Sequence, residues 1–315
     1  MQKIKYSFVL PAYKARFFRE ALDSILAQTY KDFELIIVND ASPEDLDSIV
    51  KSYDDPRIRY YVNEHNIGGK DLVAQWNHCL EYAEGDYIIL ASDDDVYFPQ
   101  YLEKMDALVQ KYPEVNVFRP RVQYIDENGN VGTVDERCGE RINALEYAYR
   151  LFLGNIGSGI PHFVFNSKEL KSIGGFVNYP KAWCADEATV LLMAKNGICI
   201  DENILFYFRS SGINISTINS YAIVKEKLKS QRLFYVFMQD YIHELPINTT
   251  EEQKKKCLLQ TGLSRRFRAV TAASINSMTF ADAIRIFPDL FSLPWASPIF
   301  IVKRVAKKII QLFSR

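Results

Sequence analysis

The sequence predicts an α/β protein with a mixed, mostly parallel central sheet, followed by a helical C-terminal region. Two observations support this class. Apolar runs of strand length alternate with amphipathic helical patterns through the first half of the chain, and beyond the run ILFYFRSSGINIS at residues 204–216 the pattern is helical. We therefore expect an α/β domain over residues 1–218, with a boundary near Ile218, and a helical region over residues 219–315.

The alternating runs predict β-α-β units whose strands are buried on both faces. In chain order the predicted elements are strand Tyr6–Leu10, helix Phe17–Gln28, strand Phe33–Val38, helix Asp45–Tyr53, strand Ile58–Val62, helix Leu72–Ala83 and strand Tyr87–Ala91. From Val115 onward strands and turns dominate, and the Asn128-Gly129 turn predicts a hairpin that we expect to form an antiparallel edge or flap. Further on, Thr249 and Glu252 have the spacing of a capping box at a helix start.

Composition excludes several classes of protein. The chain of 315 residues is 48% hydrophobic and 24% charged, as in ordinary globular proteins, and its net charge of −1 argues against binding nucleic acid. The five cysteines are scattered without a C-x-x-C pair, which suggests neither a disulfide framework nor a zinc site. No run reaches the roughly 18 apolar residues of a membrane span. These features favour a cytoplasmic protein, and they say nothing about its oligomeric state.

Polar segments follow three of the predicted strands: PAYKA after the first, NDASPED after the second and SDDD after the fourth. In parallel sheets, ligands bind beyond the carboxyl ends of the strands. The adjacent carboxylates Asp93, Asp94 and Asp95 repel one another unless a cation, a hydroxyl or backbone N–H groups compensate them. A divalent cation on a diphosphate uses such oxygen ligands, and the alternative is a solvated loop or helix cap before Pro99.

Two other acidic positions have both a structural and a functional interpretation. Asp40 ends a predicted buried strand, where it either belongs to a polar turn or accepts a hydrogen bond from a ligand N–H. Asp186 and Glu187 stand at a helix start, where the macrodipole alone favours carboxylates.

Taken together, four stretches resemble glycosyltransferase family 2 over about residues 4–216. These are FVLPAYKARFFREALDSILAQTYKDFELIIVNDAS, NIGGKDLVAQWNHCLEYAEGDYIILASDDD, IPHFVFNSKELKSIGGF and ADEATVLLMAKNG. The resemblance implies a GT-A nucleotide-binding fold and an inverting, metal-dependent transfer from a nucleotide-sugar, with UDP as the expected nucleotide. The acceptor is expected to be a saccharide or a lipid-linked glycan, and the setting surface polysaccharide or lipid-linked glycan assembly. Because the Gln-x-x-Arg-Trp motif of processive members is absent, one sugar per encounter is expected.

The resemblance also implies roles on the nucleotide side of the site. Three residues would line the base pocket: Pro11, Ala12 and Tyr13. Asp40 would bind the base, Asp93 the ribose, and Asp94 the Mn²⁺ or Mg²⁺ on the diphosphate.

On the acceptor side the resemblance implies that Asp186, eleven residues before Gly197, is the general base, with Glu187 as the back-up candidate. His162 and Trp183 fall in stretches near the expected acceptor. Each has a competing interpretation as a packing residue.

The chain departs from the family pattern at three positions. Trp76 replaces an Arg that often precedes Asn77, Ser92 replaces the first aspartate of the common D-x-D-D form, and Ser211 replaces a His after the Tyr-Arg pair. An alternative hypothesis is therefore a nucleotide- or carbohydrate-binding protein of the same fold with impaired catalysis. A sugar-nucleotide pyrophosphorylase is disfavoured because PAYKA stands where a Gly-rich, Arg-containing loop is expected.

The terminal stretch at residues 297–315 predicts an amphipathic helix. Its expected apolar face carries Ile299, Val302, Val305, Ile309 and Leu312, and its expected basic face carries Lys303, Arg304, Lys307 and Lys308. One interpretation is a helix docked on the rest of the chain. The other is peripheral contact of residues 296–315 with an anionic membrane, which places the protein at the inner face of that membrane.

Overall fold

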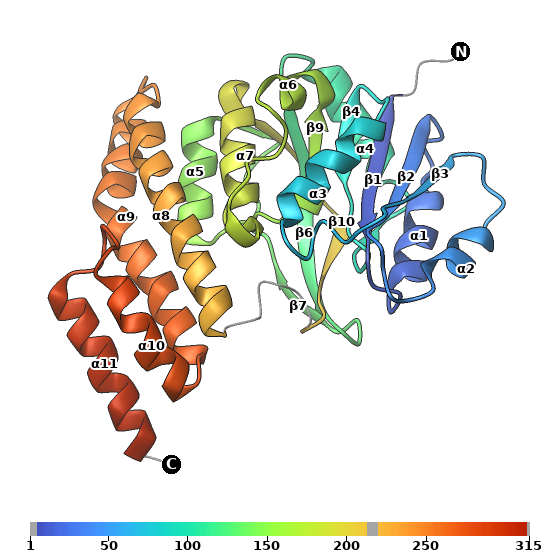
Figure 1. Cartoon of the computed structure of the whole chain (residues 1–315). Helices are drawn as coiled ribbons and strands as arrows, with labels where there is room; N and C mark the ends of the chain where they lie inside the picture. The colour runs from blue at the N-terminus through green and yellow to red at the C-terminus, as the bar shows by residue number, and fades with distance from the viewer. Residues whose placement is uncertain (1–4, 213–219, 314–315) are drawn as a thin grey trace. The chain divides into compact units, whose positions relative to one another are not determined.

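The structure is a computed structural model that describes residues 5–212 and 220–313 (Figure 1). The chain divides into two compact units, the first made of residues 1–178 and 185–212 and the second of residues 179–184 and 213–315. The boundary expected near Ile218 falls among residues 213–219, outside the described residues.

The described part of the first unit contains a ten-stranded mixed sheet with the order β3-β2-β1-β4-β9-β6-β10-β5; β7 pairs with β6, and β8 pairs with β10. The strands are β1 (Tyr6–Ala12), β2 (Phe33–Asn39), β3 (Ile58–Val62), β4 (Tyr87–Leu90), β5 (Val96–Tyr97), β6 (Val117–Asp126), β7 (Val131–Val134), β8 (Arg141–Ile142), β9 (Val164–Asn166) and β10 (Ile198–Ser210). The long pairings, β3-β2-β1-β4 and β6-β10, are parallel. The predicted α/β class with a mostly parallel sheet is confirmed.

The helices of this unit are α1 (Phe18–Leu26), α2 (Leu46–Lys51), α3 (Leu72–Cys79), α4 (Tyr101–Lys111), α5 (Ala144–Leu153), α6 (Ser167–Ser172) and α7 (Ala185–Met193). Four of them start on a side chain that accepts a backbone N–H of the first turn: Asp45, Asp71, Asn143 and Asn166. The predicted alternation of strands and helices through Ala91 is confirmed, with shifted ends.

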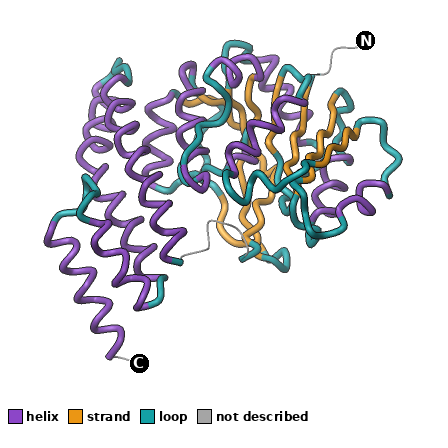
Figure 2. Tube along the Cα trace, viewed as in Figure 1, coloured by secondary structure: helices purple, strands orange, loops and turns teal. Residues whose placement is uncertain are grey.

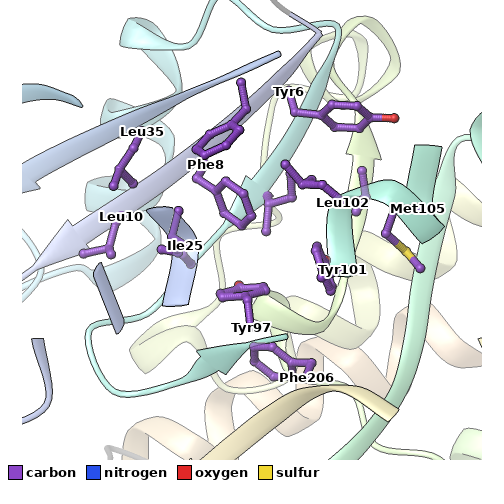
Figure 3. Close-up of a cluster of buried hydrophobic side chains, with 14 of the residues drawn as sticks. Tyr6, Phe8, Leu10, Ile25, Leu35, Tyr97, Tyr101, Leu102, Met105 and Phe206 are labelled. Carbon is purple, nitrogen blue, oxygen red and sulfur yellow. The ribbon is translucent and has the colours of Figure 1, made fainter. Parts of the chain in front are cut away.

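The main core lies on the face of the sheet that α1, α2 and α4 cover (Figure 3). Phe8 of β1 packs edge-on against Tyr97, whose ring also meets Tyr101 of α4. Because strand side chains alternate in direction, Val9 points to the opposite face, and it too is fully buried. Burial on both faces explains why β1, β2 and β4 are nearly continuous apolar runs.

The hairpin predicted at Asn128-Gly129 is confirmed, since β6 and β7 pair antiparallel around this turn. The expected antiparallel edge or flap is formed by β7, which is exposed and pairs with β6 alone among the described strands. β6 lies inside the sheet between β9 and β10, and it runs parallel to β10. The partner β10 is far away in sequence, so the local pattern could not reveal this pairing.

The described secondary structure of the second unit is helical (Figure 2). It comprises a short 3₁₀ turn at Pro180–Ala182 and the helices α8 (Tyr221–Glu244), α9 (Thr250–Ser277), α10 (Phe280–Leu290) and α11 (Pro298–Phe313). The predicted capping box of Thr249 and Glu252 is confirmed at the start of α9. Among the described residues, none of the helices has the length and hydropathy needed to cross a bilayer.

A buried ion pair joins β6 to the end of the hairpin. Arg119 and Asp135 are 1% and 4% exposed and contact each other directly. Arg119 also donates to the carbonyl of Gly157 at 2.6 Å, while Asp135 accepts the Gly157 N–H at 2.9 Å. The pair therefore fixes the loop that follows α5 onto β6.

We predict that Asp135→Ala lowers the free energy of unfolding by about 3–5 kcal/mol, because it leaves the Arg119 guanidinium buried without its counter-ion. Chemical denaturation followed by circular dichroism measures this. As a control, Glu114→Ala removes the exposed ion pair with Arg141 and should cost less than about 1 kcal/mol. Equal losses in the two variants would contradict the assigned role of the buried pair.

Candidate active site

The acidic loop between β4 and β5 is fixed to the end of β1. One carboxylate oxygen of Asp93 accepts the backbone N–H groups of Tyr13 at 3.1 Å and Lys14 at 2.9 Å. Because β1 pairs with β4 in parallel register, the two loops leave the same edge of the sheet. Burial raises the pKa of Asp93 despite these two donors, and the charge of Asp94 adds to the rise. The structure thus brings together Tyr13 and Asp93, both predicted to contact the nucleotide.

Asp94 is 7% exposed and lies between two hydroxyl groups. Ser92 donates to its Oδ1 at 3.1 Å, and Ser211 donates to its Oδ2 at 3.2 Å. Ser211 comes from the end of β10, at the position where the family pattern has His. The departure noted in the sequence therefore lies beside the residue expected to bind the metal.

Asp95 faces inward, where it accepts the Arg209 N–H at 2.8 Å and contacts the Ser92 hydroxyl. Burial and the neighbouring Asp94 charge raise its pKa well above the usual range for an aspartate. The Arg209 side chain donates to the Asp94 carbonyl at 2.9 Å and pairs with Glu20 of α1 at 2.8 Å. Arg209 thus holds the acidic loop with both its backbone N–H, which binds Asp95, and its side chain, which binds the Asp94 carbonyl. The sequence analysis assigned Arg209 no role, although it lies in the run Tyr-Phe-Arg at residues 207–209.

The acidic loop fits a hard divalent cation by its chemistry. Among the described residues, no group of three or more His, Cys, Asp or Glu side chains is placed to hold a metal by itself. The loop offers instead the carboxylate of Asp94 with the hydroxyl oxygens of Ser92 and Ser211 around it. Mg²⁺ is commonly held by one or two carboxylates together with substrate phosphates, so this donor set suits an ion that arrives with a diphosphate.

Asp40, at the end of β2, organises the loop that precedes α3. Its Oδ1 accepts from the Asn63 amide and the Ile67 N–H, both at 2.8 Å, and its Oδ2 accepts the Gly68 N–H at 2.7 Å. A Cβ at Gly68 would lie 3.0 Å from that Oδ2, which explains the glycine. Asp40 therefore has a structural role that the sequence did not reveal, and its contact with the base stays a prediction.

The three residues expected to line the base pocket differ in exposure. Tyr13 is 40% exposed and Pro11 is half-buried, whereas the Ala12 side chain is fully buried. Ala12 presents only its backbone, whose carbonyl accepts the Asp40 N–H at 3.0 Å. The carbonyl of Tyr13 accepts the hydroxyl of Ser42 at 2.6 Å, so the loops after β1 and β2 are tied together.

Asp186 lies in the first turn of α7, where its Oδ1 accepts the Glu187 N–H at 2.9 Å. Burial, and then the adjacent Glu187 charge, raises the pKa of Asp186 well above its usual range. Tyr124 on β6 senses the charge of this carboxylate and of the acidic loop. Burial raises the pKa of Tyr124, and the charges of Asp186 and Asp95 both add to the rise. Both acidic groups are therefore within electrostatic range of one phenol.

The two residues expected near the acceptor, His162 and Trp183, are placed differently. His162 is 1% exposed, and its Nδ1 accepts the Gly159 N–H at 3.0 Å among the rings of Tyr124, Phe206 and Phe208. A ring this buried presents no nitrogen to solvent, so the expected substrate contact of His162 gains no support. Trp183 belongs to the second unit, where Lys227 lies 4.4 Å from its ring centroid.

Trp76, which replaces the family Arg, is a packing residue in this structure. Its ring meets Phe176 edge-on, with centroids 6.0 Å apart. The neighbouring Asn77 exchanges two hydrogen bonds with the backbone of Phe176, at 2.8 and 3.0 Å. A Cβ at Gly175 would approach the Asn77 Oδ1 to 2.4 Å, which explains the glycine of this turn.

Comparison with known proteins agrees with this architecture. Residues 7–173 match the model of glycosyl transferase family 2, and the chain belongs to this family. A putative glycosyltransferase, EpsE, from Bacillus subtilis is 38% identical over 129 residues, which cover 40% of this chain and 45% of EpsE. An uncharacterized glycosyltransferase from Rickettsia typhi is 37% identical over 112 residues, 35% of this chain and 34% of that protein. The matches thus span less than half the length of these relatives.

A solved structure extends the similarity of fold to most of the chain. S. aureus TarS residues 1–349, crystallised in complex with UDP-GlcNAc, superposes with a TM-score of 0.62 at 17% identity, covering 88% of this chain and 82% of that one. The same fragment in complex with UDP gives a TM-score of 0.60. The predicted GT-A type of fold is confirmed by this match.

Proposed function

We propose that the protein transfers a single sugar from a nucleotide-sugar, with UDP as the nucleotide, to an acceptor hydroxyl with inversion at the anomeric carbon. The observation that carries the proposal is the acidic loop at Asp93–Asp95, held at the carboxyl end of the sheet against Tyr13 and Lys14. Family membership supports glycosyl transfer, and the complexes of TarS with UDP-GlcNAc and UDP support the choice of nucleotide. The proposed acceptor is a saccharide or a lipid-linked glycan, in surface polysaccharide or lipid-linked glycan assembly.

In this mechanism Asp93 binds the ribose, and Asp94 with Ser92 and Ser211 would hold the cation that accompanies the diphosphate. A bound Mn²⁺ or Mg²⁺ supplies positive charge that stabilises the departing diphosphate. Asp186 accepts the proton of the acceptor hydroxyl as its oxygen forms a bond to the anomeric carbon and the bond to the diphosphate breaks. Because one carboxylate base acts in a single displacement, the configuration at that carbon inverts.

The alternative is a nucleotide- or carbohydrate-binding protein without catalysis. Two observations favour it: Ser211 stands at the family His position beside Asp94, and Trp76 packs on Phe176 where an Arg is usual. A coupled assay for free UDP with candidate UDP-sugars separates the two functions. Release of UDP that requires an acceptor supports transfer, whereas tight nucleotide binding without release supports the alternative.

We predict that Asp94→Asn abolishes stabilisation of the protein by UDP with Mn²⁺, because the diphosphate then faces the remaining carboxylates without a bound cation. For the unaltered protein, UDP at 100 times its dissociation constant should add about 2.7 kcal/mol, measured as a thermal shift with and without EDTA. Asp54→Asn, at an exposed carboxylate, should leave the shift unchanged. If UDP stabilises the unaltered protein equally in EDTA, the metal has no part in nucleotide binding.

We predict that Asp186→Asn lowers turnover by about 10²–10⁴ while donor binding is retained, because the carboxylate acts on the acceptor proton. Glu187→Gln is the matched control and should retain turnover at neutral pH. Steady-state kinetics with the donor and acceptor that release UDP measure both variants. Loss of turnover in Glu187→Gln alone would assign the general base to Glu187. Full activity in both variants would show that neither residue is the base.

The raised pKa of Asp186 predicts where activity is lost in acid. A base works deprotonated, so turnover should fall as pH drops through a value above about 3.9, the ordinary pKa of aspartate. Glu187→Gln removes the neighbouring charge and should move this acid limb to lower pH. The pH profiles of turnover for the two proteins decide this, and an acid limb unmoved by Glu187→Gln contradicts the coupling of the two carboxylates.

A further inference from the structure

Helix α11 carries an apolar stripe that faces solvent. Ile299, Val302 and Ile310 are 68%, 66% and 64% exposed, and Ile309 is 41% exposed. These positions, with the exposed Ala306, recur at helical spacing and form one face of the helix. The helix is docked on the second unit, as one interpretation of the sequence expected, but most of the residues expected on its apolar face point away from the contact.

The opposite face of α11 holds the helix on the second unit. Lys308 is 6% exposed, and its ammonium donates to the carbonyls of Asn276 at 3.0 Å and Met278 at 2.8 Å. These carbonyls stand at the end of α9, where a cation is favourable. Ile301, also buried, lies on the same face as Lys308. The sequence-based assignment of Lys308 to an exposed basic face is therefore wrong, and its anchoring turns the stripe outward.

Exposed basic residues border the stripe. Lys303 and Lys307 are exposed, and at 100° per residue they lie along the edge of the stripe marked by Ile310. Residues 290–315 include five Lys or Arg and no Asp or Glu. The exposed side of α11 therefore combines an apolar strip with positive charge.

We propose that α11 binds the surface of a membrane containing anionic phospholipid. The stripe would enter the boundary between headgroups and acyl chains, with Lys303 and Lys307 beside the lipid phosphates. A second copy of the chain fits this face less well. A twofold contact sets the same patch against itself, so the lysines of the two copies would meet without an acidic partner in this stretch.

The test is co-sedimentation of the full chain with vesicles of phosphatidylcholine alone and of phosphatidylcholine with phosphatidylglycerol. We expect binding to the anionic vesicles that weakens in high salt. The triple variant Ile299→Ser, Val302→Ser, Ile310→Ser should bind at least about tenfold more weakly, because the apolar surface is lost. The double variant Lys303→Gln, Lys307→Gln should bind anionic vesicles about 30-fold more weakly and change little with phosphatidylcholine.

A matched control changes three exposed apolar residues on α8 and α9 of the same unit: Leu233→Ser, Val236→Ser and Leu258→Ser. It should bind vesicles like the unaltered protein. Thermal melting of each variant shows that the fold is retained. Absence of binding by the unaltered protein, or equal binding by the stripe and control variants, would overturn the proposal. The proposal would also be overturned if vesicle binding is absent and sedimentation velocity shows a dimer that the stripe substitutions dissociate.

Discussion

Three adjacent carboxylates at the end of β4 share one loop because donors from three parts of the chain hold them. Asp93 accepts hydrogen bonds from two backbone N–H groups of the loop after β1. Asp94 accepts them from the hydroxyls of Ser92 and Ser211, and Asp95 accepts one from the Arg209 N–H on β10. The backbone donors come from β10 and from the loop after β1, which lie on opposite sides of β4 in the sheet. The order of the strands is therefore what makes the acidic loop possible, since the donors reach it from both directions.

The electrostatics of the same loop support the proposed binding of a cation. Burial raises the pKa of Asp93 and of Asp95, and Asp94 contributes to both rises. Because burial disfavours the charged forms, the ionised loop carries negative charge that is stable only beside a positive charge. A divalent cation offsets it and also attracts a diphosphate. The adjacent loops provide the rest of such a site, because Tyr13 and Ser42 tie the ends of β1 and β2 together around Asp40.

Much of this arrangement could be predicted from the sequence, because it depends on local patterns and on strand order. The alternation of elements through Ala91 placed Tyr13, Asp40 and Asp93 at one edge of the sheet. Contacts between distant segments could not be predicted. Nothing local to Ser211 or Arg209 shows that β10 lies beside the acidic loop, and the pattern around Asp40 gives no sign of its three intramolecular donors.

The terminal helix illustrates the same limit. Its sequence correctly indicates an amphipathic helix, and helical spacing groups its apolar residues. Which face is buried depends on the carbonyls of Asn276 and Met278, more than 25 residues earlier, which bind Lys308. The charged Lys308 is buried while the apolar Ile299 and Val302 are exposed, which is the reverse of what hydropathy alone predicts.

A crystal structure of the chain with UDP and Mn²⁺ would test the central claim most directly. The account predicts anomalous scattering from manganese within ligand distance of Asp94, with the diphosphate on the ion and the nucleoside against Pro11, Tyr13 and Asp93. UDP bound at another place on the protein, or bound at this edge with the manganese absent under saturating conditions, would contradict it.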